Sequence, residues 1–145
     1  MNQTKVKSMI NVRFALYQGP AIFWTILIFV LSSIPSLPTP DLGFSPQDKI
    51  YHLIFYTVYG FFLGMAFYYQ EWSVRMQRNW VVWAILFGTL YAISDEIHQY
   101  FVPGRKMEFW DIVADSLGVI LGVLIFRFRV VKKSARSGSF PDSIF

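Results

Sequence analysis

Three short stretches of the chain carry side chains that can exchange protons, bind an anion or coordinate a cation. Carboxylates and imidazoles serve as general acids and bases and as ligands for divalent metals, and a guanidinium binds a carboxylate or phosphate bidentately. No recognised nucleophile or metal motif accompanies them, so we assign no catalytic residue and no metal. We expect one functional, ligand-binding cluster made of Asp48 and His52, then Asp95, Glu96, Gln99 and Arg105, and finally Asp111 and Asp115.

The composition around these residues is typical of a membrane protein. Of 145 residues, 54% are hydrophobic and only 15% are charged, and the mean hydropathy is +0.42. The absence of cysteine excludes a disulfide framework, a thiolate nucleophile and a cysteine-ligated metal. Most of the 13 Lys and Arg residues flank apolar runs, namely Lys5, Lys7, Arg13, Arg75, Arg78, Arg127, Arg129, Lys132, Lys133 and Arg136. This distribution indicates membrane topology signals and excludes a nucleic-acid groove.

Four apolar segments must position the polar residues, over residues 14–34, 50–69, 80–101 and 109–126. In the third and fourth segments the purely apolar parts, 80–93 and 117–126, are too short to cross a hydrocarbon layer of about 30 Å. The acidic parts of these segments must therefore be helical and immersed. The predicted fold class is all-α: a polytopic membrane protein with four transmembrane helices in a bundle.

The basic flanks also predict the domain organisation and the orientation. We expect a basic cytoplasmic N-terminus at 1–13, the four-helix domain at 14–131 and a disordered cytoplasmic tail at 132–145. Pro20 is expected to lie early in the first helix or to kink it, and the proline-rich segment 32–47 to be an irregular connection. Both termini then lie in the cytoplasm.

The predicted topology brings the polar residues to one depth. At 1.5 Å per residue, Asp115 stands ~18 Å and Asp111 ~24 Å above the cytoplasmic end of helix four. The adjacent acids of helix three reach ~22 to 24 Å, and His52 lies ~6 Å below the outer boundary. Asp48 and His52 share a helical face, as do Asp111 and Asp115. Because charged groups in a span turn away from lipid, we expect a shared cavity in the outer third of the bilayer.

Three motifs in order make the chain similar to the VanZ-like membrane protein family. The resemblance covers roughly residues 22–131. Where we expect Asn in the family's D-x-x-x-N arrangement, this chain has Asp115. The motifs are Asp48-Lys49 with His52, Tyr56 and Gly60; SDEIHQYFVPGR at 94–105; and Asp111, Asp115 and Gly118 in DIVADSLG.

The resemblance implies a small multi-pass protein of the bacterial cytoplasmic membrane and cell envelope. The family's namesake is associated with reduced susceptibility to teicoplanin, a lipoglycopeptide antibiotic that acts on outer-leaflet cell-wall precursors. The implied partners are membrane lipids and a lipid-linked envelope precursor or a lipoglycopeptide. We predict no cofactor, and the oligomeric state stays open.

Some of the polar residues also have structural interpretations. Arg105 follows a Pro-Gly turn and can fold back to pair with Asp95 or Glu96, which would close the hairpin between helices three and four. Asp115 must be either protonated or held ionised by a cation from helix two or three. His52 is the candidate partner for Asp115, as an imidazolium or as a co-ligand of a metal.

Two G-x-x-x-G motifs are present in the apolar segments. Gly60 and Gly64 lie in the second segment, and Gly118 and Gly122 lie in the fourth. Such motifs let helix backbones approach closely. We expect them to pack helices within the bundle, with a dimer interface as the alternative.

Three classes of function remain compatible with the residues. The leading hypothesis is a binding or accessory membrane protein whose outward polar cavity holds an amphiphile, with Arg105 on an anionic head group. The second is a membrane enzyme acting on a lipid-linked phosphate or ester through an acid–base pair or a divalent metal. The third is a proton-coupled transporter, which four helices would form only as an oligomer.

Overall fold

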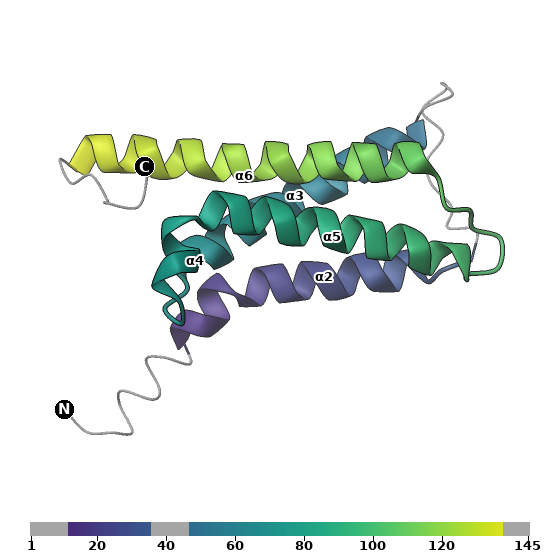
Figure 1. Ribbon diagram of the computed structural model, residues 1–145, viewed down its shortest axis with the longest axis horizontal. Helices are drawn as coiled ribbons and strands as arrows, with labels where there is room; N and C mark the ends of the chain where they lie inside the picture. Colours follow the sequence, from purple (N-terminus) through teal and green to yellow (C-terminus); the bar gives the residue numbers. More distant parts are fainter. Residues whose placement is uncertain (1–11, 36–46, 138–145) are drawn as a thin grey trace.

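The computed structural model describes residues 12–35 and 47–137, and every regular element in these ranges is an α-helix (Figure 1). This confirms the all-α fold class. The segments 1–11, 36–46 and 138–145 lie outside the described residues and include most of the predicted proline-rich connection. The helices are α2 (Gly19–Ser32), α3 (Gln47–Tyr69), α4 (Val74–Arg78), α5 (Trp80–Tyr100) and α6 (Phe109–Ser137).

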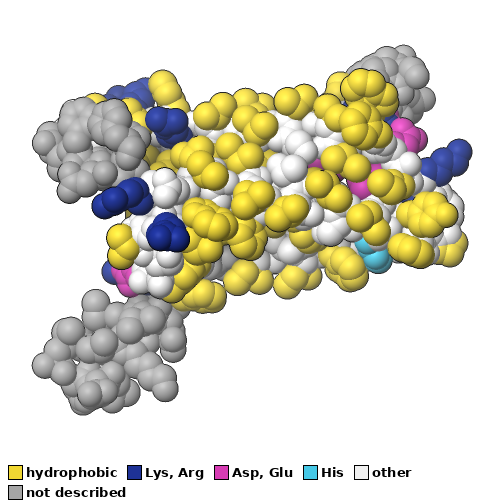
Figure 2. Space-filling view, in the orientation of Figure 1, with side chains coloured by type: hydrophobic (Ala, Val, Ile, Leu, Met, Phe, Trp, Pro, Cys, Tyr) yellow, Lys and Arg dark blue, Asp and Glu magenta, His cyan; other side chains and the backbone are white. Residues whose placement is uncertain are grey.

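The helices α3, α5 and α6 are long and apolar enough to cross a membrane. Large apolar side chains are exposed along them, as on lipid-facing helices, and include Val82, Leu86, Leu90, Leu117 and Leu124. Figure 2 shows an apolar middle on this face of the molecule, with Lys and Arg side chains only toward its two ends. The chain is therefore a multi-pass membrane protein.

The first apolar segment is helical in two consecutive stretches. Residues 12–17 are helical, Gln18 is a turn, and α2 follows with 14 residues and Pro20 in its first turn. Helical hydrogen bonds continue through the turn, because the Gln18 N–H donates to Phe14 O (2.9 Å) and the Ile22 N–H donates to Gln18 O (3.1 Å). The proline lacks an N–H and so interrupts the pattern locally without ending the helical course.

The helices α3 and α6 run parallel and in closest contact, and glycines make that contact possible (Figure 1). A Cβ atom at Gly122 would overlap the carbonyl oxygen of Thr57, and one at Gly60 would overlap that of Val119. A Cβ at Gly118 would lie 2.6 Å from Leu53 O. These three glycines of the two G-x-x-x-G motifs therefore lie where the backbones of α3 and α6 approach each other.

The connection from α5 to α6 folds back tightly over residues 101–108. Gly104 has a positive φ of 81°, which a residue without Cβ adopts easily, and the Arg105 N–H donates to Val102 O (3.1 Å). The turn brings the last residues of α5 next to the first residues of α6. As predicted, the acidic parts of both segments are helical.

The fourth helix is longer than the predicted apolar segment and continues to Ser137. It therefore extends six residues into the predicted tail, 132–137. The basic side chains of Lys132, Lys133 and Arg136 lie in its last turns, where positive charge favours the C-terminal end of a helix.

Candidate functional site

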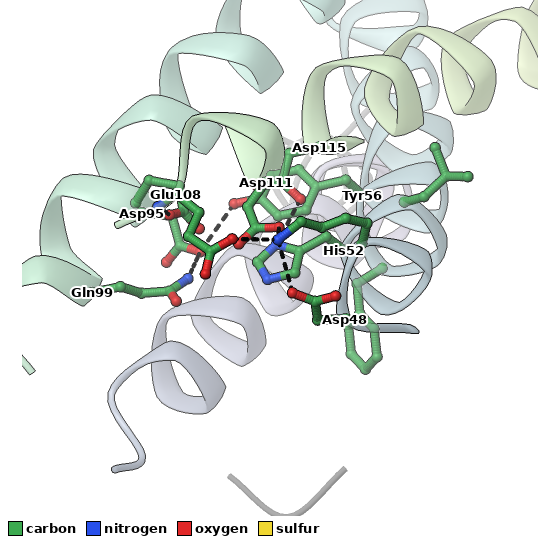
Figure 3. A network of polar contacts seen from close by, with 12 residues as sticks. Asp48, His52, Tyr56, Asp95, Gln99, Glu108, Asp111 and Asp115 are labelled. Atoms are coloured by element: carbon green, nitrogen blue, oxygen red, sulfur yellow. Dashed lines mark hydrogen bonds and ion pairs between the residues drawn. The ribbon is translucent and has the colours of Figure 1, made fainter. Parts of the chain in front are cut away.

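The ammonium group of Lys49 lies between three carboxylates near the start of α3 and α6. Its Nζ is 2.8 Å from Asp48 Oδ2, 2.6 Å from Glu108 Oε2 and 2.7 Å from Asp111 Oδ1. The three acids converge in Figure 3. The side chains of Asp48 and Glu108 are about half exposed, whereas Asp111 is buried. We call Asp48, Glu108 and Asp111 the outer triad.

His52 and Asp115 form a contact one helical turn deeper. The Nδ1 atom of His52 is 3.0 Å from Asp115 Oδ1, and Asp115 is fully buried. Since an ionised carboxylate only accepts hydrogen bonds, Nδ1 carries the proton in this contact. The predicted partnership of His52 with Asp115 is present. The parallel register of α3 and α6 produces it, because the same register places Lys49 beside Asp111.

Asp95 belongs to α5, and its buried side chain contacts α3. Its Oδ2 accepts hydrogen bonds from Tyr56 Oη (3.2 Å) and from Gln99 Nε2 (3.2 Å). Its Oδ1 is buried without a hydrogen-bond partner. Asp95 and Gln99 are therefore together, as their i, i+4 spacing predicts, and Tyr56 joins them from α3.

Glu96 is fully buried and connects the end of α5 to the start of α6. Its Oε2 accepts a hydrogen bond from the backbone N–H of Glu108 (3.0 Å), while its Oε1 has no partner. Glu108 immediately precedes α6, where free N–H groups and the helix dipole favour a carboxylate.

The predicted ion pair of Arg105 with Asp95 or Glu96 is wrong. Among the described residues no carboxylate lies within ion-pair distance of Arg105, and its buried Nε has no partner. The physical reason is that each acid has another donor: the backbone N–H of Glu108 stabilises one oxygen of Glu96, and Tyr56 and Gln99 stabilise one oxygen of Asp95.

The site contains more buried negative charge than positive charge. Among the described residues, Lys49 is the one Lys or Arg within ion-pair distance of its acids, and His52 adds a charge only when protonated. Unpaired buried carboxylates cost several kcal/mol each, so the arrangement favours a further cation or bound protons. The buried carboxylates are those of Asp95, Glu96, Asp111 and Asp115.

Two residues of the site were missed by sequence reasoning. Neither Lys49 nor Glu108 is among the residues of the cluster predicted from the sequence. Two signals in the sequence point to them. Lys49 is a basic residue on the outward side, where the predicted topology leaves few basic residues. Glu108 is three residues from Asp111 and lies on the same helical face. His98 lies away from the cluster, because it stacks on Phe29 and contacts Ser33 Oγ through Nε2 (2.9 Å).

Two sets of side chains have the ligand types and spacing for a cation. The outer triad is one, and its three oxygens surround the Lys49 ammonium. The other, which we call the inner triad, consists of His52, Glu96 and Asp111. In each set the ligand atoms lie within 4.8 Å of one another.

Removal of the Lys49 charge tests the role of the outer triad. Lys49→Met should lower the free energy of unfolding by about 1 to 3 kcal/mol, between the values for exposed and fully buried ion pairs. The matched control is Lys106→Met, because Lys106 is exposed and has no ion pair among the described residues. Unfolding by SDS in mixed micelles measures both variants, and equal losses of stability would contradict the role of Lys49.

Comparison with known proteins identifies the family of the chain. Residues 12–131 match the model of the VanZ/LLP1 family. An uncharacterised protein of Schizosaccharomyces pombe (strain 972 / ATCC 24843) is 29% identical over 107 residues, which is 72% of this chain and 60% of the relative. No solved structure matches the chain. Because the family match spans most of the chain and includes every residue of both triads, the chain belongs to the VanZ/LLP1 family.

Proposed function

We propose that this chain is a four-span membrane protein that binds the phosphate-bearing head group of an amphiphile at the outward end of its bundle. The observation that carries the proposal is Arg105, whose guanidinium has no carboxylate partner among the described residues although its loop ends at Glu108 of the acidic cluster. A guanidinium suits bidentate binding of phosphate. The exposed Lys106 adds a second positive charge to the same loop.

The surroundings of Arg105 suit a lipid. Large apolar and aromatic side chains are exposed on both sides of the 101–108 loop and provide surface for an acyl or prenyl chain and for the membrane interface. Below the loop, the acidic cluster offers hydrogen-bond acceptors to hydroxyl or ammonium groups of a head group. The exposed side chains are Tyr100, Phe101, Met107, Phe109 and Trp110.

The ligand class is a lipid of the outer leaflet. The association of the family's namesake with teicoplanin favours a lipid-linked envelope precursor, and a link of this chain to glycopeptide susceptibility is part of the proposal. The relative in a fission yeast favours a head group that bacterial and eukaryotic membranes share. Phosphate attached to a lipid satisfies both considerations.

The four spans and the orientation are part of the same proposal. The helical course from 12 to 32 has 21 residues (32 − 12 + 1), which at 1.5 Å per residue is about 31 Å and matches the hydrocarbon layer. Basic residues flank the bundle at the end that carries α4, which includes Arg75 and Arg78. The positive-inside rule then places both termini and α4 in the cytoplasm and the 101–108 loop outside.

Cysteine labelling tests this orientation, since the chain has no cysteine of its own. Met107→Cys should react with a membrane-impermeant thiol reagent added to intact cells, whereas Val74→Cys should react only after permeabilisation. Both positions are exposed, so accessibility within the protein does not explain a difference. The reverse pattern would place the acidic cluster on the cytoplasmic side.

A second candidate function is hydrolysis or transfer at a lipid-linked phosphate or ester. The contact between His52 and Asp115 favours it, because a carboxylate that orients an imidazole is a common arrangement for a general base. The two functions differ in whether the bound lipid changes chemically.

Native mass spectrometry of protein purified in mild detergent tests lipid binding. The intact chain should retain a phosphate-bearing lipid, and Arg105→Ala should lose it. Arg78→Ala is the matched control, because Arg78 is exposed at the opposite end, and it should retain the lipid. Equal lipid content in both variants would contradict the proposal, whereas time-dependent loss of phosphate or an acyl group from the lipid would favour the enzyme.

A further inference from the structure

The inner triad joins one side chain from each of three helices. His52 comes from α3, Glu96 from α5 and Asp111 from α6, and one ligand atom of each lies within 4.8 Å of the others. Glu96 and Asp111 are buried, and His52 is largely buried. The three groups therefore meet inside the bundle, where water competes little for a cation.

The outer triad shows what a cation does in this site. There three carboxylates are brought together by the Lys49 ammonium, which lies within 2.8 Å of each. Asp111 belongs to both triads. The inner triad has the same spacing, but among the described residues no Lys or Arg reaches Glu96. Lys49 therefore contacts all three members of the outer triad but, of the inner triad, only Asp111.

The position of His52 suits a metal ligand. Its Nδ1 donates to Asp115, which leaves Nε2 with its lone pair available. A metal-bound histidine nearly always donates its other ring N–H to a carboxylate or carbonyl, which fixes the ring and increases its basicity. The contact between His52 and Asp115 is this arrangement.

Glu96 provides an independent indication of a ligand. Its side chain is 0% exposed, and its Oε1 has no partner in the part of the chain that the structure describes, while Oε2 accepts a hydrogen bond from the N–H of Glu108. A buried carboxylate oxygen without a donor is costly and is normally satisfied. A cation in the inner triad would satisfy it.

We propose that His52, Glu96 and Asp111 bind one divalent metal ion, with Asp115 as the carboxylate that orients His52. One imidazole and two carboxylates suit Zn²⁺ or Mn²⁺. Ligand atoms about 2.1 Å from Zn²⁺ are about 3.4 Å apart, which lies within the 4.8 Å limit on the spacing of the triad. Three protein ligands leave a coordination position free for water or a phosphate oxygen. This proposal does not depend on lipid binding at Arg105.

Metal analysis of the full-length protein in detergent tests the site. After removal of loosely bound ions, Zn²⁺ and Mn²⁺ are titrated separately and bound metal is measured by inductively coupled plasma mass spectrometry. The wild-type chain should bind one ion. Glu96→Gln and His52→Gln should abolish that binding, and Asp115→Asn should weaken it by about 10- to 100-fold.

Glu71→Gln is the matched control, because its exposed carboxylate pairs with Arg13 and belongs to neither triad. It should bind the ion as the wild type does. Zn K-edge absorption provides a readout of the ligands: the zinc-loaded wild type should show one imidazole ligand, and the control variant should give the same spectrum. Wild-type protein that binds neither ion, or inner-triad variants that fold and bind like the wild type, would overturn the proposal. Loss of lipid in Arg105→Ala with metal retained would leave this site intact.

Discussion

The close approach of α3 and α6 is the contact on which the rest of the structure depends. Glycines at Gly60, Gly118 and Gly122 let the two backbones come nearer than side chains would allow. Because the helices are parallel, the register that the glycines set within α3 and α6 continues to the N-terminal ends of both helices. There it aligns His52 with Asp115 and Lys49 with Asp111. A packing interaction thus determines where the charged groups meet.

The charges that meet there cannot be explained by packing alone. Burial of four carboxylates within the bundle requires compensation, and the protein provides it unevenly. Lys49 neutralises the exposed side of the cluster, and the N–H of Glu108 and the hydroxyl of Tyr56 stabilise single oxygens deeper inside. The remaining demand for positive charge is the feature that connects the fold to a function, whether a metal ion or a head group meets it.

Much of the fold follows from the sequence, and part of the site does not. The purely apolar parts of the third and fourth segments are too short to cross a bilayer, which predicted that the adjoining acidic parts are helical. The helices α5 and α6 do include these acidic parts. Helical spacing predicted that His52 shares a face with Asp48 and that Asp115 shares one with Asp111. The similar predicted depths of these residues in the bilayer made His52 the candidate partner of Asp115. The partner of Arg105 was predicted wrongly, because proximity in sequence says nothing about competing donors such as a backbone N–H. The role of Lys49 depends on Glu108, 59 residues away, and no local pattern encodes that contact.

Replacement of one glycine in the α3–α6 contact tests the central claim most directly. Gly122→Ala places a methyl group against the Thr57 carbonyl and should lower the free energy of unfolding by about 1 to 3 kcal/mol. Gly19→Ala is the control, since a Cβ there meets nothing within 4 Å, and it should leave stability unchanged or raise it slightly. SDS unfolding in mixed micelles measures both. If Gly122→Ala is as stable as Gly19→Ala, the glycine contact does not hold α3 and α6 together and the account is contradicted.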